Sequence, residues 1–410
     1  MNVEIRIPGA DALGRIFLTW TPVEATARVL NPVGTSPIRV TLRNAGSEGR
    51  VRFATTRTHL GTPTLALRLP IDGTPARFFV AGEFGRPSVS LGDAVIQARR
   101  TGTTTVLGRK PVTVRVRKNA QTLSPAERDR FVAAFGTLNG GGAGRFRDFR
   151  DMHVDAATNE AHGNVGFLPW HRAYLLDLER ELQAIDPGVA LPYWRFDQAA
   201  PNVFSREFMG VSNAAGTVEF AAGHPFNTWR TDERLGISRS PRFVTGSAPG
   251  GLLIETETLG LGGAAPNATY GGFAGMEGDP HGLAHTRFGG FISRIPTAAR
   301  DPLFFMLHAN VDRLWAKWQW VNGRTSPDEA LTFAPAVPNR IGHRIPDTMW
   351  PWNGVTGAPR PRTAPGGTFP PSRSTTQPGL KPRVGRMIDH QAVGGGRPLA
   401  FAYDDVPFEL

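Results

Sequence analysis

The chain has 410 residues, 40% of them hydrophobic and 20% charged, which is typical of a globular protein large enough for more than one domain. The net charge of +11 would suit nucleic acid, but the basic residues are scattered and no basic run has interleaved aromatics, so we expect no nucleic-acid partner. The absence of cysteine excludes disulfides and thiolate metal sites. With no apolar leader and no run as long as a membrane span, we expect a cytoplasmic protein without a membrane partner.

Residues 1–118 are predicted to form a β-sandwich-like domain. Apolar and polar residues alternate at 38–43, 51–53, 65–69 and 112–117, and turn-forming residues separate these segments. Alternation of this kind gives each strand one apolar face. Six to eight such strands predict two sheets packed face to face.

A mainly helical domain is predicted over residues 119–322. Ser124 and Glu127 form a capping-box pattern with proline between them, which marks the start of a helix. Further helical segments are predicted at 147–153, 170–185 and 302–320, the last with Asp301 as its N-cap.

Two regions rich in proline and glycine are predicted to lack long elements. Residues 200–275 indicate extended loops between the helices. Residues 323–410 are predicted to form an irregular tail that ends in a strand at 399–403. The predicted chain is therefore multi-domain: a β domain, a mainly α domain and a tail.

Six histidines fall into two groups of three: His153, His162 and His171, then His281, His285 and His308. Neutral imidazole is a common ligand of copper, zinc and iron, so two all-histidine groups indicate two metal ions. His281 and His285 are four residues apart, a spacing that puts both on one face of a helix. No geometry follows from the spacing of the first group alone.

The alternative for any single histidine is an ordinary core residue. His308 lies in an apolar helical segment, where a lone histidine would usually be buried without a ligand role. Six histidines in matching places favour the metal interpretation. The other histidines are expected to be dispensable for activity: His59, His224, His343 and His390.

Two long phrases around these histidines resemble the two copper signatures of type 3 copper proteins, which comprise tyrosinases, catechol oxidases and molluscan-type hemocyanins. The first phrase matches through His162, Phe167, Trp170, His171, Arg172, Leu175 and Glu179. The second matches through Asp301, Pro302, Phe304, Phe305, His308 and Asp312. The resemblance covers roughly residues 120–320, and the β domain and the tail lie outside it.

The resemblance implies a four-helix bundle around two copper ions, each held by one histidine triplet, with O2 as co-substrate. Many relatives tether one histidine to cysteine through a thioether, which this chain cannot form. Phe167, Trp170 and Phe304 are therefore expected to support the site by packing. Asp312 is expected either to orient His308 or to form a surface ion pair with Arg313 or Lys317.

The implied activity is oxidation of small phenols: o-diphenols to o-quinones, with hydroxylation of monophenols as a further activity. The alternative is a hemocyanin-like reversible O2 carrier, but carriers of this type usually have many concatenated units, whereas this chain has one. A dinuclear zinc hydrolase is a weaker alternative, because such sites usually contain carboxylate ligands. A homo-oligomer is compatible with the sequence.

Two further positions bear on which phenols react. In the family, a glutamate and an asparagine hold a water that takes the proton of a monophenol. Glu277 matches the glutamate, but Gly282 stands where the asparagine would be. We therefore expect stronger diphenol oxidation than monophenol hydroxylation, unless another group such as Thr286 holds the water.

Relatives often cover the copper site with a separate segment that inserts an aromatic or aliphatic side chain. Here the β domain or the tail, which contains Phe401, Tyr403 and Phe408, is a candidate cover. The alternative is a β domain that serves solubility or assembly.

Overall fold

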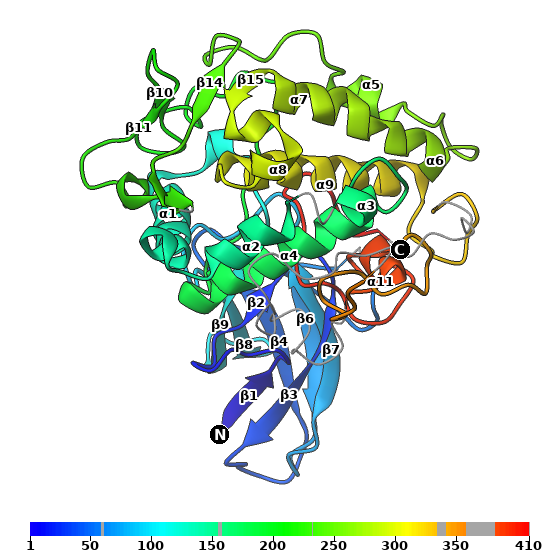
Figure 1. The fold of residues 1–410 in the computed structure, drawn as a ribbon. Coiled ribbons are helices and arrows are strands. Elements are labelled where there is room, and N and C mark those ends of the chain that lie inside the picture. The colour runs from blue at the N-terminus through cyan, green and yellow to red at the C-terminus, as the bar shows by residue number, and fades with distance from the viewer. Residues whose placement is uncertain (59–60, 155–157, 232, 334–341, 358–381, 410) are drawn as a thin grey trace. The chain divides into compact units, whose positions relative to one another are not determined.

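The structure is a computed structural model that describes residues 1–410 except 59–60, 155–157, 232, 334–341, 358–381 and 410 (Figure 1). The chain divides into two compact units. Unit 1 comprises Met1–Val116 together with Gln391–Leu410, and unit 2 comprises Arg117–His390. The first boundary lies close to the predicted one. The predicted tail does not form a separate part, because its last residues belong to unit 1 and the residues before them to unit 2.

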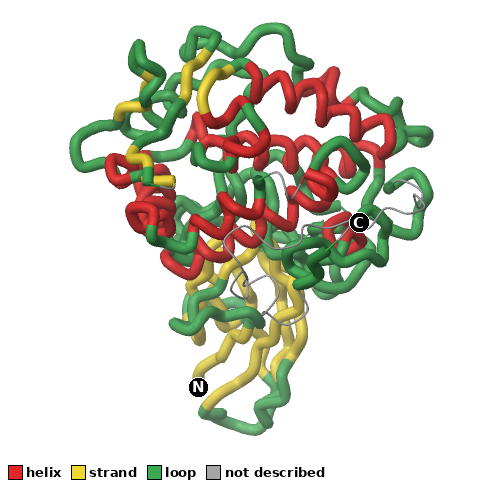
Figure 2. Tube along the Cα trace, viewed as in Figure 1, coloured by secondary structure: helices red, strands yellow, loops and turns green. Residues whose placement is uncertain are grey.

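Within the described residues, unit 1 contains two sheets, whose strands are yellow in Figure 2. The first has the order β1-β3-β7-β5, with β1 (Asn2–Arg6), β3 (Val23–Leu30), β7 (Ala76–Gly82) and β5 (Val51–Ala54). The second has the order β2-β9-β8-β4-β6, with β2 (Phe17–Leu18), β9 (Val106–Val114), β8 (Ala94–Arg100), β4 (Ile38–Asn44) and β6 (Thr64–Leu69). Neighbouring strands are antiparallel except β2 and β9.

Alternate residues of both sheets meet in one hydrophobic core. Val40 and Leu42 of β4 are fully buried there, together with Ile96 of β8 and Phe78 of β7. This two-residue period agrees with the alternation in the sequence, so the β character of this region is confirmed.

The C-terminal segment joins the core of unit 1 through its side chains. Phe408 belongs to the core, and the Trp20 indole donates a hydrogen bond of 2.7 Å to the Tyr403 carbonyl. The strand predicted at 399–403 is wrong, because these residues form no strand. Aromatic side chains fix this segment in place of a strand ladder.

Unit 2 is mainly helical. Its described α-helices are α1 (Pro125–Asn139), α2 (Phe146–Met152), α3 (Thr158–Ala161), α4 (Phe167–Ile185), α5 (Glu255–Leu259), α6 (Tyr270–Phe273), α7 (Leu283–Thr286), α8 (Ile295–Ala298), α9 (Leu303–Asn322) and α11 (Val384–Ile388). Short 3-10 helices are η1 (Ala120–Thr122), η2 (Gly140–Gly142), η4 (Pro225–Thr228), η5 (Ala274–Glu277) and η7 (Phe291–Ser293). The segment η6 (Gly278–Gly282) is a short π-helix. Among the described residues, no helix is both long and apolar enough to cross a bilayer.

The predicted helix starts depend on local capping. The Ser124 hydroxyl accepts from the Glu127 amide, and the Glu127 carboxylate accepts from the Ser124 amide, so the capping box is confirmed. The Asp301 carboxylate accepts from the Leu303 amide at 2.9 Å, although Pro302 occupies the N-cap position of α9. Both long helices, α4 and α9, are buried over most of their length and contact each other.

The connections of unit 2 contain only short elements. Residues 200–275 are mostly loop, as predicted, with the strands β10 (Val211–Ser212), β11 (Val218–Glu219), β12 (Arg230–Thr231), β13 (Arg234–Leu235) and β14 (Arg239–Pro241). β14 pairs with β15 (Phe288–Gly290). Much of the predicted irregular segment, 334–341 and 358–381, lies outside the described residues.

Candidate metal centre

The structure brings the six histidines together as two triads. His153, His162 and His171 form the first triad. The second triad consists of His281, His285 and His308. In each triad the three nitrogen atoms that could bind a metal lie within 4.8 Å of one another. Each triad therefore has the compactness that a single metal ion requires.

Each triad draws its histidines from several elements. His153 follows the last residue of α2, His162 follows α3, and His171 lies in the first turns of α4. His281 lies in η6 and His285 in α7, on successive helical turns. His308 lies in α9.

Backbone carbonyl groups orient four of the six imidazole rings. The Nδ1 atoms of His153, His171, His281 and His285 lie 2.6–3.1 Å from the carbonyl oxygens of Ile295, Phe167, Glu277 and Ile292. A ring that donates through Nδ1 keeps its Nε2 lone pair free for a metal. The Nε2 atoms accordingly face each other, at 3.5 Å between His171 and His153 and 3.1 Å between His285 and His308.

His308 is oriented by packing instead. Its Nδ1 has no hydrogen-bond partner within the described part of the chain, and the same holds for His162. The His308 ring centre lies 4.1 Å from that of Phe304 and 4.3 Å from that of His171, whose ring is nearly parallel at 13°. The stacked His171 and His308 rings place the two triads side by side.

Burial keeps the histidines neutral. It lowers the pKa of His153 to about 3, of His162 to about 2 and of His285 to about 4, and neighbouring imidazoles contribute to the first two shifts. The pKa values of His171, His281 and His308 are well below 6.5 for the same reason. Six neutral imidazoles, with no carboxylate in either triad, are a donor set that fits copper.

Aromatic side chains line the triads, as the sequence predicted. The Phe167 ring centre lies 4.6 Å from His171 and 4.8 Å from His281, so this residue touches both triads. Trp170 lies 5.0 Å from His171, and Phe304 lies 4.6 Å from His153. These rings exclude water from the buried side of the site.

A cavity of about 400 Å³ gives access to the site. Four of the six histidines line it, together with Glu277, Gly282, Thr286, Arg294 and Ile295 among others. The sequence singled out Glu277, Gly282 and Thr286 but missed Arg294, which has no motif around it. The cavity is large enough for a single-ring phenol.

Glu277 and Gly282 lie together at this cavity. Burial raises the pKa of Glu277 to about 7, and the Gly163 amide donates to its Oε1 at 2.6 Å. A Cβ on Gly282 would meet the Glu277 carbonyl oxygen at 3.3 Å, so a side chain there requires this backbone atom to shift by a few tenths of an ångström. The Thr286 hydroxyl donates to the Gly282 carbonyl at 3.1 Å, which commits its hydrogen to the backbone.

Both roles predicted for Asp312 are wrong. Its Oδ1 lies 2.5 Å from Arg172 Nε, and its Oδ2 lies 3.0 Å from Arg117 Nη1. Arg313 and Lys317 pair instead with Glu255. The physical reason is burial: the guanidinium groups of Arg172 and Arg117 are fully enclosed and need a carboxylate between them.

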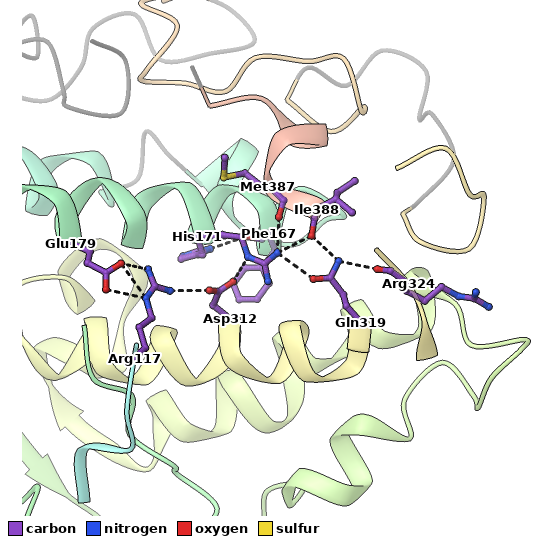
Figure 3. Close-up of polar contacts among 10 residues, drawn as sticks. Arg117, Phe167, His171, Glu179, Asp312, Gln319, Arg324, Met387 and Ile388 are labelled. Atoms are coloured by element: carbon purple, nitrogen blue, oxygen red, sulfur yellow. Dashed lines mark hydrogen bonds and ion pairs between the residues drawn. The ribbon is translucent and has the colours of Figure 1, made fainter. Parts of the chain in front are cut away.

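This ion-pair network continues along both long helices (Figure 3). Arg117 also binds Glu179 of α4 at 2.8 Å. The Arg172 Nη1 atom donates to the carbonyls of Met387 and Ile388 at 2.6 and 3.1 Å. Arg172 follows His171, and Asp312 lies one helical turn beyond His308, so the network joins the two ligand-bearing helices beside the site.

The part of the chain that contains both triads is similar in sequence to known proteins. The sequence model described as the common central domain of tyrosinase matches residues 143–321. A tyrosinase of Streptomyces glaucescens is 34% identical over 269 residues, which cover 59% of this chain and 94% of that protein. A tyrosinase of Streptomyces antibioticus is 31% identical with the same coverage, and grixazone synthase of Streptomyces griseus is 29% identical over 60% of this chain and 95% of that protein.

Proposed function

Because this chain belongs to the tyrosinase family of type 3 copper proteins, we propose that it is a polyphenol oxidase that uses O2 to convert o-diphenols into o-quinones. The observation that carries the proposal is the stacked contact between two all-imidazole triads, with 4.3 Å between the His171 and His308 ring centres. In this proposal each triad holds one copper ion, and α2, α4, α9 and the η6–α7 turns form a four-helix bundle around the pair.

Bound copper would supply two adjacent one-electron redox centres, which match the two-electron oxidation of a diphenol; two diphenols provide the four electrons that reduce one O2 to two waters. The protein contributes the fixed geometry of the ligands. Backbone carbonyls fix four rings, and Phe304 and His171 fix His308, so the donor atoms do not need to reorganise during the reaction.

Glu277 is proposed as the proton acceptor for incoming phenols. A carboxyl group with a pKa of about 7 can both take and return a proton near neutral pH. A monophenol needs its proton removed through a well-placed water, and Gly282 has no side chain to orient that water. We therefore propose that diphenol oxidation exceeds monophenol hydroxylation.

A reversible O2 carrier, the alternative function, predicts a different result in an oxidation assay. Purified protein with two coppers per chain should convert a catechol in air, with quinone absorbance rising until the catechol is consumed. Reversible oxygenation without turnover would contradict the enzymatic proposal. The similarity to proteins named tyrosinase over 94% of their length supports the enzyme. A cytoplasmic location and a homo-oligomeric state stay predictions.

A further inference from the structure

The two sheets of unit 1 differ in how they accommodate arginine. β4, β6, β8 and β9 contain no aspartate or glutamate and no aromatic residue. Alternate positions on these strands place five arginines on the outward side, here called the basic sheet face: Arg39, Arg43, Arg68, Arg99 and Arg109. Arg39, Arg68 and Arg109 are exposed, and the other two are half-buried.

The strand register concentrates these charges. Arg39 lies directly opposite Arg68, and Arg99 lies opposite Thr41 on the neighbouring strand. Arg43 and Arg109 flank the same residue, Gln97, from either side. Like charges at directly opposed positions destabilise a sheet, so this arrangement costs the fold stability.

The other sheet neutralises its arginines. Glu4 pairs with Arg6 at 3.0 Å and with Arg28 at 2.5 Å. Glu24 lies 3.6 Å from Arg77. On the basic sheet face, by contrast, none of the five guanidinium groups has an ion pair within the described residues.

The net charge of the chain is also distributed unequally between the two units. Unit 1 contains 17 basic and 10 acidic residues, so about two-thirds of the chain's net charge of +11 belongs to its smaller unit. Composition alone had suggested scattered charge. Strand pairing instead collects part of it on one sheet.

A hollow of about 420 Å³ opens beside the basic sheet face. Its lining includes four arginines and three threonines: Arg43, Arg50, Arg99, Arg100, Thr41, Thr64 and Thr103. The one acidic residue in the lining, Glu83, is 2.9 Å from Arg52 and so is already paired. This hollow offers positive charge and hydroxyl groups together.

We propose that the basic sheet face binds a linear acidic polysaccharide whose sugars carry carboxylates. Guanidinium groups bind carboxylates in a bidentate manner, and the threonine hydroxyls can bond to sugar hydroxyls. Four strands about 4.8 Å apart spread the charges over about 14 Å, which a flexible chain can follow. Single-stranded nucleic acid needs several aromatic rings for stacking, whereas Phe17 of β2 is the one aromatic residue in the described strands of this sheet. A rigid convex duplex would meet only part of an open sheet.

The test uses full-length protein and polygalacturonate as the probe, in affinity electrophoresis and titration calorimetry. Binding should weaken as salt is added, and fully methyl-esterified polymer of the same backbone should not bind. The double variants Arg39→Gln/Arg68→Gln and Arg43→Gln/Arg99→Gln should each bind about tenfold more weakly.

The matched control is Arg6→Gln/Arg77→Gln on the other sheet, whose side chains are 62% and 78% exposed. This variant should bind polygalacturonate as the parent protein does. The Arg39/Arg68 variant should melt no lower than the parent, since it removes a repulsion, so weaker binding cannot be attributed to unfolding. Equal losses in the control, no binding of polygalacturonate, or tighter binding of duplex DNA or anionic vesicles would overturn the proposal.

Discussion

The two histidine triads have the same donor set but different support. Each has two buried histidines and one half-buried histidine. In the second triad the half-buried member, His285, is fixed by the Ile292 carbonyl at 2.6 Å, whereas His162 of the first triad has no Nδ1 partner among the described groups. The second triad also has two histidines on successive turns. Each triad thus has two rings fixed by carbonyl groups, and the ring without such a bond is the half-buried His162 in the first triad but the fully buried His308 in the second.

Removing a histidine should have the largest effect. His308→Ala leaves two donors in the second triad and should abolish catechol oxidation, while copper falls from two ions per chain to about one. His162→Ala should also lose activity. Quinone absorbance and metal analysis measure both effects, and His224→Ala, outside the triads, serves as the control. Parent-level turnover by the His308→Ala protein would refute the ligand assignment.

The carboxylate of Asp312 joins the two long helices that carry His171 and His308, because it pairs with the buried guanidinium groups of Arg172 and Arg117. Asp312→Asn leaves the buried guanidinium groups of Arg172 and Arg117 without full compensation and should lower the free energy of unfolding by about 3–5 kcal/mol. Urea unfolding measures the change. Glu24→Gln is the control, because Glu24 and its partner Arg77 are 49% and 78% exposed and the loss should stay below about 1 kcal/mol. Similar losses in the two variants would contradict a central role for Asp312.

The Gly282→Asn variant tests whether the residue after His281 affects removal of the proton from a monophenol. Gly282→Asn should raise the ratio of monophenol to diphenol activity by about tenfold, because the amide can orient a water toward Glu277. The added Cβ would lie 3.3 Å from the Glu277 carbonyl oxygen, which must shift slightly, so stability should fall by about 1 kcal/mol. Comparing initial rates on tyrosol and 4-methylcatechol gives the ratio. An unchanged ratio, or rapid hydroxylation by the parent enzyme, would show that another group positions the base.

The smallest expected effect concerns Arg294, an exposed cation in the cavity lining. It should favour catechols with a carboxylate by attraction at the cavity mouth. Arg294→Gln should raise KM for 3,4-dihydroxyphenylpropionate about threefold and leave KM for 4-methylcatechol unchanged. Arg234→Gln, an exposed arginine that does not line the cavity, is the control. Equal changes for both substrates would exclude a charge-based role.

Local features of the fold were readable from the sequence because they depend on residues close together in the chain. The capping box at Ser124 and the alternation in β4 each depend on a few neighbouring residues. The ends were less accurate: α4 begins at Phe167, although Trp170 was the predicted start. Phe167 continues the apolar stripe of this helix, and Pro169 is tolerated in the first turn because the N–H that it lacks has no intrahelical partner there.

The site was predictable where a motif contained it and unpredictable where contacts span the chain. The family phrases contain His162, His171 and His308 and the aromatic wall. The other three histidines were grouped by their order in the chain and, for His281 and His285, by their four-residue spacing. The partner of Asp312 was not, because Arg172 lies 140 residues away and Arg117 lies 195 residues away. Arg117 also precedes the region of resemblance, so no motif indicated it.

The ion-pair network determines which fragment of this protein could be produced by itself. A fragment cut to the matched region, 143–321, would lack Arg117, and its Arg172 would lose the carbonyl acceptors at Met387 and Ile388. Such a fragment would keep all six histidines. Charged groups between its two long helices would lose their partners or become exposed to solvent. Expression of the catalytic part should therefore extend at least from Arg117 to Ile388, well beyond the homologous segment.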